Sequence, residues 1–205
     1  MTPSEPRVVT VGPLRPGPLG DAVLERAASG RAGLAELLGD DGQRHALFRP
    51  GMRADRFLVA CAGGELAGWL SLKYAGAGPF APRLADFTRC HGVARGLHAF
   101  AVFSAIEARS RPAHRAAYLY GIDVLKPFRG RRHVMPRPVG EALIEAAMRQ
   151  AAALGFAWLD MEVRTAAAQA LALRMGAVPS APSGLARIWR GDYIRLTIDL
   201  AARDE

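Results

Sequence analysis

A run of mostly apolar aromatic and branched residues at 118–125, and a stretch at 156–163 in which apolar and polar positions alternate, predict two β-strands. A Lys-Pro pair ends the first stretch. Between the two stretches, Val139 and Leu143 begin a run of apolar positions at helical spacing, which predicts a helix that ends near residue 154. Two strands joined by one helix form a right-handed crossover, so these two strands are expected to lie parallel.

The rest of the chain contains shorter stretches of the same two kinds. The pattern predicts strands at 7–11, 56–61 and 66–73, helices at 21–28, 32–38, 88–110 and 166–175, and a final hairpin with strands at 185–189 and 193–200. The hairpin at 56–73 is the clearest, because Gly63 and Gly64 supply the positive φ values that a tight turn needs. The helix at 88–110 has a mostly apolar face and is expected to pack on the sheet. Nothing in this order requires a second domain, so residues 1–205 are expected to form one.

A chain of 205 residues of which 50% are hydrophobic is long enough to bury one sizeable core. Its formal net charge is +8, carried mainly by arginine, so its surface favours phosphorylated or polyanionic ligands. A biased composition rich in Ala, Gly, Arg and Pro explains the same charge. Nucleic-acid binding is a rival function that we disfavour, because the sequence contains no recognised nucleic-acid-binding motif.

Cys61 and Cys90 lack the spacing of a redox or metal-binding pair, which predicts reduced thiols in a cytosolic protein, with Cys61 in the core. The first residues do not combine a basic stretch with an apolar run, and no later apolar segment reaches membrane-spanning length. A cytoplasmic location without membrane contact is therefore expected. His91 and His98 are seven residues apart on one predicted helix, too far to chelate one metal ion, so no metal site is expected.

An arginine-rich turn follows the strand at 118–125, with the sequence Lys126-Pro127-Phe128-Arg129-Gly130-Arg131-Arg132-His133. The turn stands where a strand passes into a helix. Free backbone N–H groups and the positive end of the helix dipole meet at such a junction. The turn is therefore predicted to bind phosphate groups.

The element order, this turn, and a downstream helix that closes in Leu173-Arg174-Met175-Gly176-Ala177 resemble the GCN5-related N-acetyltransferase (GNAT) superfamily. The resemblance implies an α/β (α+β) fold: a mixed, mostly antiparallel central sheet with helices on both faces and one parallel strand pair that splays into a V-shaped slot. It implies acetyl-CoA or another acyl-CoA as donor, with its pyrophosphate held by the turn and its pantetheine arm in the slot. The implied activity is N-acyl transfer by direct attack of a small-molecule amine on the thioester. The terminal hairpin often lies at a dimer contact in proteins of this kind, so a homodimer is an open alternative.

The resemblance also implies a set of cofactor-binding residues. Val124 falls where the family strand bulges and splays, a backbone N–H near Leu125 contacts the thioester carbonyl, and Thr165 takes the place of a cofactor-contacting Asn. The residues implied around the pyrophosphate are Arg129, Gly130, Arg131, Arg132, His133, Val139 and Gly140.

The sequence departs from the family pattern in several places. The loop between Arg131 and Val139 is longer and lacks the middle glycine, and its two prolines, Pro136 and Pro138, cannot donate N–H bonds. A phosphate there depends more on arginine side chains. Ala172 stands where the family commonly has the Tyr that protonates the leaving thiolate. These departures keep a second interpretation open, in which the same fold takes its acyl group from a carrier protein, performs another reaction, or binds without catalysis.

Three residues are candidates for catalysis, namely Asp123, Tyr120 and Glu162. Asp123 is either functional or paired with an arginine, because an unpaired carboxylate on a central strand is costly to bury. Tyr120 is expected on the strand face of Ile122 and Val124, opposite Asp123, with its hydroxyl either in the slot or bonded to a neighbour in the core. Glu162 either acts as a base through water or pairs with a surface arginine.

Aromatic residues are expected on the acceptor side of this fold, namely Trp69, Phe80, Phe87, Phe100, Phe103 and Trp189. Most of them are expected in the core. If some line the mouth of the site, they predict a hydrophobic or aromatic small-molecule acceptor. Cys90 and His91 are adjacent and diverge on a helix, which argues against a thiol-based mechanism.

Overall fold

The computed structural model describes residues 8–30, 35–110, 112, 114–129, 137–181 and 193–201. Within these residues a mixed sheet of seven strands has the order β1-β2-β3-β4-β5-β7-β6. The strands are β1 (Val9–Pro13), β2 (Phe57–Ala62), β3 (Glu65–Lys73), β4 (Ala116–Val124), β5 (Trp158–Val163), β6 (Val178–Pro179) and β7 (Ile194–Asp199). The helices are α1 (Pro18–Ser29), α2 (Ala35–Leu38), α3 (Asp41–Phe48), α4 (Leu84–His91), α5 (Val93–Arg109), α6 (Val139–Ala153) and α7 (Ala166–Arg174), with short 3₁₀ turns at Arg49–Gly51, Ala54–Arg56 and Lys126–Phe128.

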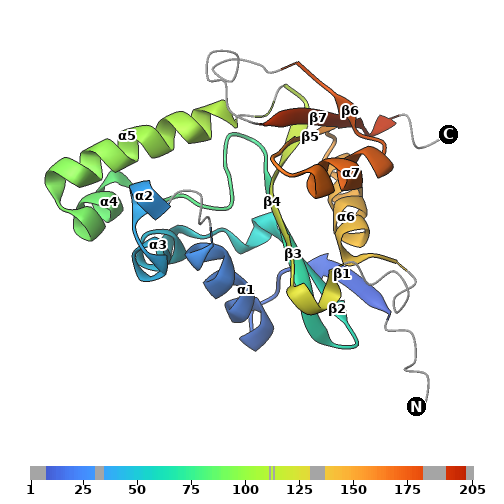
Figure 1. Ribbon diagram of the computed structural model, residues 1–205, viewed down its shortest axis with the longest axis horizontal. Coiled ribbons are helices and arrows are strands. Elements are labelled where there is room, and N and C mark those ends of the chain that lie inside the picture. Colours follow the sequence, from blue (N-terminus) through green and yellow to red (C-terminus); the bar gives the residue numbers. More distant parts are fainter. Residues whose placement is uncertain are drawn as a thin grey trace.

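Adjacent strands in this sheet are antiparallel except for β4 and β5, which are parallel. Helix α6 connects these two strands, as predicted from the helical spacing of apolar residues between them. Figure 1 shows α6 and α7 on one face of the sheet and α1 to α5 on the other. The predicted fold class is confirmed: a mixed, mostly antiparallel sheet with one parallel pair and helices on both faces.

Two hydrophobic clusters hold the helices to the sheet, one on each face. The first joins α6 to the strands through fully buried side chains such as Leu70, Leu143 and Leu159. The second joins α1, α3, α4 and α5 to the opposite face and includes the buried rings of Phe48 and Phe87. Because each face of the sheet is covered, its central strands are apolar on both sides.

The N-terminal elements differ in their bounds from the prediction. Strand β1 extends to Pro13, which is tolerated because β1 pairs only with β2 at the edge of the sheet. Helix α1 begins at Pro18, so Asp21 lies inside its first turn and Gly17 takes the N-cap position. Helix α3 begins at Asp41, and Asp40 is its N-cap: Asp40 accepts the N–H of Gln43 at 2.8 Å, and the Gln43 side chain accepts the N–H of Asp40 at 3.1 Å.

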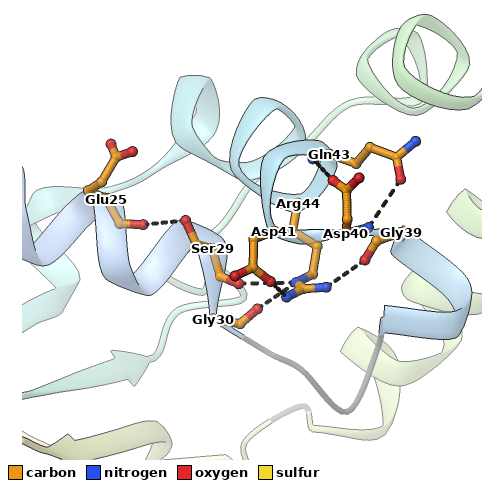
Figure 2. Close-up of polar contacts among 8 residues, drawn as sticks. All are labelled: Glu25, Ser29, Gly30, Gly39, Asp40, Asp41, Gln43 and Arg44. Carbon is orange, nitrogen blue, oxygen red and sulfur yellow. Dashed lines mark hydrogen bonds and ion pairs between the residues drawn. The ribbon is translucent and has the colours of Figure 1, made fainter.

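Arg44 of α3 ties the ends of three helices together. Its guanidinium is buried and donates to the backbone oxygens of Ser29 and Gly30, at the end of α1, over 3.1 and 2.8 Å. It also donates to the oxygen of Gly39, which follows α2, and to the carboxylate of Asp41 (Figure 2). These carbonyls have no partner within their own helices, so one side chain fixes how α1 and α2 meet α3.

The helix predicted at 88–110 is two helices, which is a correction. Helix α4 starts earlier, where the N–H of Arg83 donates to Asp86 at 2.8 Å, and Gly92 then breaks the chain with a φ of +76°. Helix α5 projects away from the sheet along most of its length (Figure 1). It contacts β3 near its C-terminal end, where Glu107 and Ser110 bind Lys73.

The C-terminal region differs from the prediction in one further element. Val178–Pro179, for which no strand was predicted, pairs with β7 as the short strand β6. The strand predicted at 185–189 lies outside the described residues.

Candidate functional site

Strands β4 and β5 separate part of the way along their length. Their parallel ladder begins with Ala116 opposite Trp158 and ends with Leu119 opposite Met161. Both strands continue past this point, β4 to Val124 and β5 to Val163. The residues of β4 are buried up to Leu119 and only half-buried beyond it. The predicted slot is therefore present, and it opens directly after Leu119, before the expected position at Val124.

A β-bulge lies where the two strands begin to separate. Ser71 of β3 pairs with Gly121, and the next residue, Leu72, pairs with Leu119, so Tyr120 is the additional residue on β4. The bulge shifts the alternation of side chains by one position. Leu119 belongs to the cluster under α6, and beyond the bulge Ile122 packs against that same cluster, whereas Tyr120 packs against the cluster on the opposite face.

The prediction that Tyr120 shares a strand face with Ile122 and Val124 is therefore wrong. Strict alternation would have placed Tyr120 opposite Asp123, but both residues line one cavity on the face that carries α1. The bulge brings together two of the three catalytic candidates that the sequence analysis placed on opposite faces.

This cavity, which we call the β4 cavity, has a volume of about 300 Å³. Its lining comes from α1, from the strands β2, β3 and β4, and from Phe80. The residues are Arg26, Ala27, Gly30, Phe57, Trp69, Ser71, Phe80, Tyr120, Gly121, Ile122 and Asp123. A lining of four aromatic side chains and two charged ones, Arg26 and Asp123, is typical of a small-molecule site.

Asp123 pairs with Arg129, one of the predicted pyrophosphate-binding residues. The Arg129 Nη2 lies 3.1 Å from Asp123 Oδ1, and the Arg129 Nε donates to the backbone oxygen of Val124. The side chains of Arg129 and Asp123 are 58% and 44% exposed, so the pair contributes little to stability. Of the two alternatives for Asp123, the arginine pair is present; Asp123 also lines the cavity, and its functional role remains a prediction.

The N–H of Leu125 donates to the oxygen of Ala67 at 2.9 Å and belongs to the β3–β4 ladder. This particular N–H is therefore used within the sheet, and the contact of a nearby backbone N–H with a thioester carbonyl remains a prediction. In an antiparallel pair, successive residues point their N–H groups to opposite sides. Because Val124 lies opposite Gly68 in this register, the N–H groups of Val124 and Ile122 point away from β3, toward the gap beside β5.

The start of α6 lies against β4 and α7. Val139 is buried, and a Cβ added to Gly140 would lie 2.9 Å from Cδ2 of Leu171 and 3.8 Å from Cγ2 of Val124. The structure thus brings together Val124, Val139 and Gly140 of the predicted cofactor set. The predicted residues Gly130, Arg131, Arg132 and His133 lie outside the described residues, so their roles remain predictions.

Thr165 begins α7. Its hydroxyl accepts the N–H of Ala168 at 3.2 Å, which is the geometry of an N-cap. This contact explains the residue structurally, and its contact with a cofactor remains a prediction.

Glu162 lies on β5 just beyond the end of the parallel ladder and is half-buried. It is opposite Arg195 in the antiparallel pairing of β5 with β7. Leu159 and Met161 belong to the cluster under α6, so alternation turns Glu162 to the other face of the sheet. This is the face that carries Tyr120 and Asp123.

A polar cluster that was not predicted from the sequence lies behind Tyr120. The Tyr120 hydroxyl donates to the Glu107 carboxylate, and the Lys73 ammonium lies 2.8 Å from the other carboxylate oxygen of Glu107. Lys73 also donates to Ser110 Oγ at 3.1 Å. The available signal was a lysine at the end of an apolar strand, because a buried ammonium needs a partner. The sequence alone did not identify Glu107 as that partner.

The surroundings of Cys90, His91 and Cys61 do not favour thiol chemistry. Burial, with a further contribution from the Asp86 carboxylate, raises the pKa of the Cys90 thiol, which disfavours the reactive thiolate. Burial, reinforced by Arg95, lowers the pKa of His91. Cys61, predicted in the core, is only partly buried at its edge.

The described residues contain no group of three or more His, Cys, Asp or Glu placed to hold a metal ion. Across those same ranges, every helix is too short or too polar to span a membrane.

No family model and no curated protein matches this sequence. Solved structures do match the fold. The chain is similar to a putative arylalkylamine N-acetyltransferase of the yellow fever mosquito, with a TM-score of 0.56, 18% identity, and coverage of 94% of this chain and 87% of that one. It is also similar to SsHAT, with a TM-score of 0.53, 20% identity, and coverage of 94% and 98%.

A third similar structure is a polyamine N-acetyltransferase of Drosophila melanogaster that forms N-acetylagmatine. Its TM-score is 0.52 and its identity 13%, over 93% of this chain and 99% of that one. At these identities the likeness shows the fold. The chain has the fold of the GCN5-related N-acetyltransferases, as the resemblance in its sequence predicted.

Proposed function

We propose that this protein is an acyl-CoA-dependent N-acyltransferase that uses acetyl-CoA and acts on a small-molecule amine. The observation that carries the proposal is the separation of β4 from β5 after Leu119 and Met161, beside a cavity that Tyr120 and Asp123 line. The similar structures named above are N-acetyltransferases of arylalkylamine and polyamine substrates by their names, which supports the same reaction class.

The gap between β4 and β5 is the proposed place of the pantetheine arm. Its edge presents the N–H groups of Ile122 and Val124, which suit the oxygen of a thioester carbonyl as negative charge develops there. Val139 and Gly140 at the start of α6 lie beside Val124 at one end of the gap. Arg129, held to the last residues of β4, supplies a cation for the phosphates, and residues 130–133 are proposed to complete this contact.

The β4 cavity is the proposed acceptor site. Its aromatic lining from Phe57, Trp69 and Phe80 favours an amine with a hydrophobic or aromatic body. Asp123 attracts the cationic form of the amine, and Tyr120 or Glu162 takes up the proton that the nitrogen must lose before or during attack. Direct attack on the thioester forms the amide and releases CoA as its thiolate.

One observation favours the alternative without catalysis. The position of the usual acid on α7 is Ala172, and this residue is buried. The helix therefore offers no hydroxyl there to protonate the thiolate. In the alternative, the fold binds an acyl donor without transferring its acyl group to an amine.

The proposal is tested by following CoA thiol release from acetyl-CoA with 2-phenylethylamine, tryptamine and agmatine, together with calorimetric titration of acetyl-CoA. We expect saturable binding and amine-dependent release, fastest with an aromatic amine. The Asp123→Asn variant is expected to lower kcat/KM about 10²-fold. Asp199→Asn, on β7 opposite Trp158 at the far end of β5, is the matched control and is expected to keep the rate. Absence of acetyl-CoA binding contradicts the proposal, and binding without transfer to any amine favours the alternative.

A further inference from the structure

A second cavity, of about 370 Å³, lies next to the β4 cavity, and Phe80 lines both of them. We call it the α5 cavity, because one wall comes from Phe100, Phe103, Ser104 and Glu107 of α5. The opposite wall comes from the loop at 76–82. The candidate catalytic residues Tyr120 and Asp123 line the β4 cavity, whereas the proposed reaction gives no role to the α5 cavity.

A hydrogen bond connects the two cavities. Tyr120 lines the β4 cavity and donates its hydroxyl proton to Oε1 of Glu107, which lines the α5 cavity. Tyr120 is the residue that the bulge places on this face. The Tyr120 oxygen still has lone pairs to accept a proton, while its own proton already points at a carboxylate.

Lys73 fixes this carboxylate in place. Its ammonium donates to Oε2 of Glu107 at 2.8 Å, to the backbone oxygen of Glu107 at 2.7 Å and to Ser110 Oγ at 3.1 Å. These three bonds use all three ammonium protons. The Lys73 side chain is 5% exposed and that of Glu107 is 19% exposed, so the pair is held in position while Glu107 keeps some contact with the α5 cavity. An anchor for α5 would not require a tyrosine that reaches into the neighbouring cavity.

We propose that Tyr120 and Glu107 relay a proton from the amine in the β4 cavity to the α5 cavity, an inference that rests on the proposed function. An N–H bond of the substrate ammonium breaks and its proton bonds to the Tyr120 oxygen. The Tyr120 O–H breaks in the same step and its proton bonds to Oε1 of Glu107. The electron pair of the N–H bond stays on nitrogen, which attacks the thioester.

Protonated Glu107 then loses its proton to solvent through the α5 cavity, which restores the carboxylate and its ion pair with Lys73. The net change is one proton moved from the amine to solvent. Tyr120 contacts the substrate in this step. Glu107 acts through Tyr120, and Lys73 positions Glu107. Among the described residues, the charged ones that line the β4 cavity are Asp123 on β4 and Arg26 on α1, and neither also lines the α5 cavity.

The relay is tested with Tyr120→Phe, Glu107→Gln and the double variant, measured for kcat and KM across the pH range with acetyl-CoA and the best aromatic amine. Each single variant is expected to lower kcat about 10²-fold at neutral pH. The double variant is expected to be no slower than either single one, because both remove the same path. The deficit is expected to shrink as the pH rises and the free amine replaces the ammonium. Acetyl-CoA binding is expected to stay unchanged.

Ser104→Ala is the matched control, because Ser104 lines the same cavity one helical turn before Glu107. Glu107→Asp is expected to recover part of the rate, which a purely structural role would not predict. Tyr120→Phe removes a single oxygen atom, so it decides the case if Glu107→Gln does not fold. A wild-type pH profile in Tyr120→Phe overturns the relay and leaves the proposed function standing. No amine-dependent CoA release from the wild type overturns both.

Discussion

Gly68 of β3 and Val124 of β4 lie opposite each other with no room for a side chain between them. A Cβ on Gly68 would lie 2.5 Å from the backbone oxygen of Asp123 and 3.2 Å from the Cα of Val124. Both obstacles are backbone atoms, which cannot move aside without shifting the strand. Gly68 therefore determines how closely the end of β4, which is paired with β3 but not with β5, lies against β3. The width of the gap beside β5 depends on this distance.

Gly68→Ala is expected to push the end of β4 away from β3. Overpacking of this kind costs about 1–3 kcal/mol, and we expect a loss of unfolding free energy in that range together with weaker acetyl-CoA binding. Urea denaturation and calorimetry measure the two effects. Gly12→Ala in the edge strand β1 is the control, since a Cβ there meets nothing within 4 Å. Equal stability of the two variants would show that the contact at Gly68 does not constrain β4.

The buried pair of Asp160 and Arg195 joins β5 to β7. Arg195 Nη2 lies 2.7 Å from Asp160 Oδ2, both side chains are less than a tenth exposed, and Thr197 donates to the other oxygen of Asp160 at 2.8 Å. Asp160→Asn removes the negative charge that pairs with this guanidinium.

Breaking a buried pair in this way costs about 3–5 kcal/mol, and we expect Asp160→Asn to lose stability in that range on urea denaturation. Asp21→Asn breaks the exposed pair with Arg49, at 3.4 Å, and is expected to cost less than about 1 kcal/mol. If both variants lose the same free energy, the interior pair does not hold β5 to β7.

Arg44→Met is expected to loosen the junction of α1, α2 and α3. The substitution leaves the backbone oxygens of Ser29, Gly30 and Gly39 without their donor, and we expect a loss of about 3 kcal/mol in unfolding free energy. Because α1 forms a wall of the β4 cavity, KM for the amine should rise more than KM for acetyl-CoA. Arg49→Met, at a half-buried arginine of the same region that pairs with Asp21, is the control. A rise in KM for acetyl-CoA but not for the amine would contradict the prediction that Arg44 supports the acceptor site.

His91 makes stability depend on pH. Both ring nitrogens are buried without a hydrogen-bond partner among the described residues, and burial lowers the pKa of His91 below its ordinary 6.5. The unfolded chain therefore takes up a proton at His91 at a pH where the folded chain does not. This contribution to stability is intact above the ordinary pKa and is lost as the pH falls below it toward the lower folded pKa.

We expect the wild type to lose more Tm between about pH 7.5 and about pH 5.5 than His91→Gln does, as measured by scanning calorimetry. His114→Gln, at an exposed histidine, serves as the control and should keep the wild-type dependence. An unchanged dependence in His91→Gln would assign the pH effect to other groups.

The central crossover was predictable from sequence because its signals are local and strong. Aromatic and β-branched residues at 118–125 form β4, and the apolar spacing from Val139 forms α6 within one residue of the predicted end. The sequence has a glycine at the break, Gly92, but the apolar positions that follow it favoured one continuous helix from residue 88.

The arrangement of the candidate site was less predictable, because it depends on how strands pair. The bulge at Tyr120 arises from the register of β4 against Ser71 and Leu72 of β3. The sequence of β4 alone does not predict it. The same register directs the N–H of Leu125 to Ala67. The link of Tyr120 to Glu107 joins residues whose side chains meet only after α5 has folded back toward β3.

The most direct test of the account is amide hydrogen exchange at the end of β4, measured by NMR with and without saturating acetyl-CoA. We expect exchange of the Ile122 and Val124 N–H groups to slow when the donor fills the gap. The Leu125 N–H, already bonded to Ala67, is the internal reference and should change little. Unchanged exchange at Ile122 and Val124 under saturating acetyl-CoA would contradict the claim that the donor binds between β4 and β5.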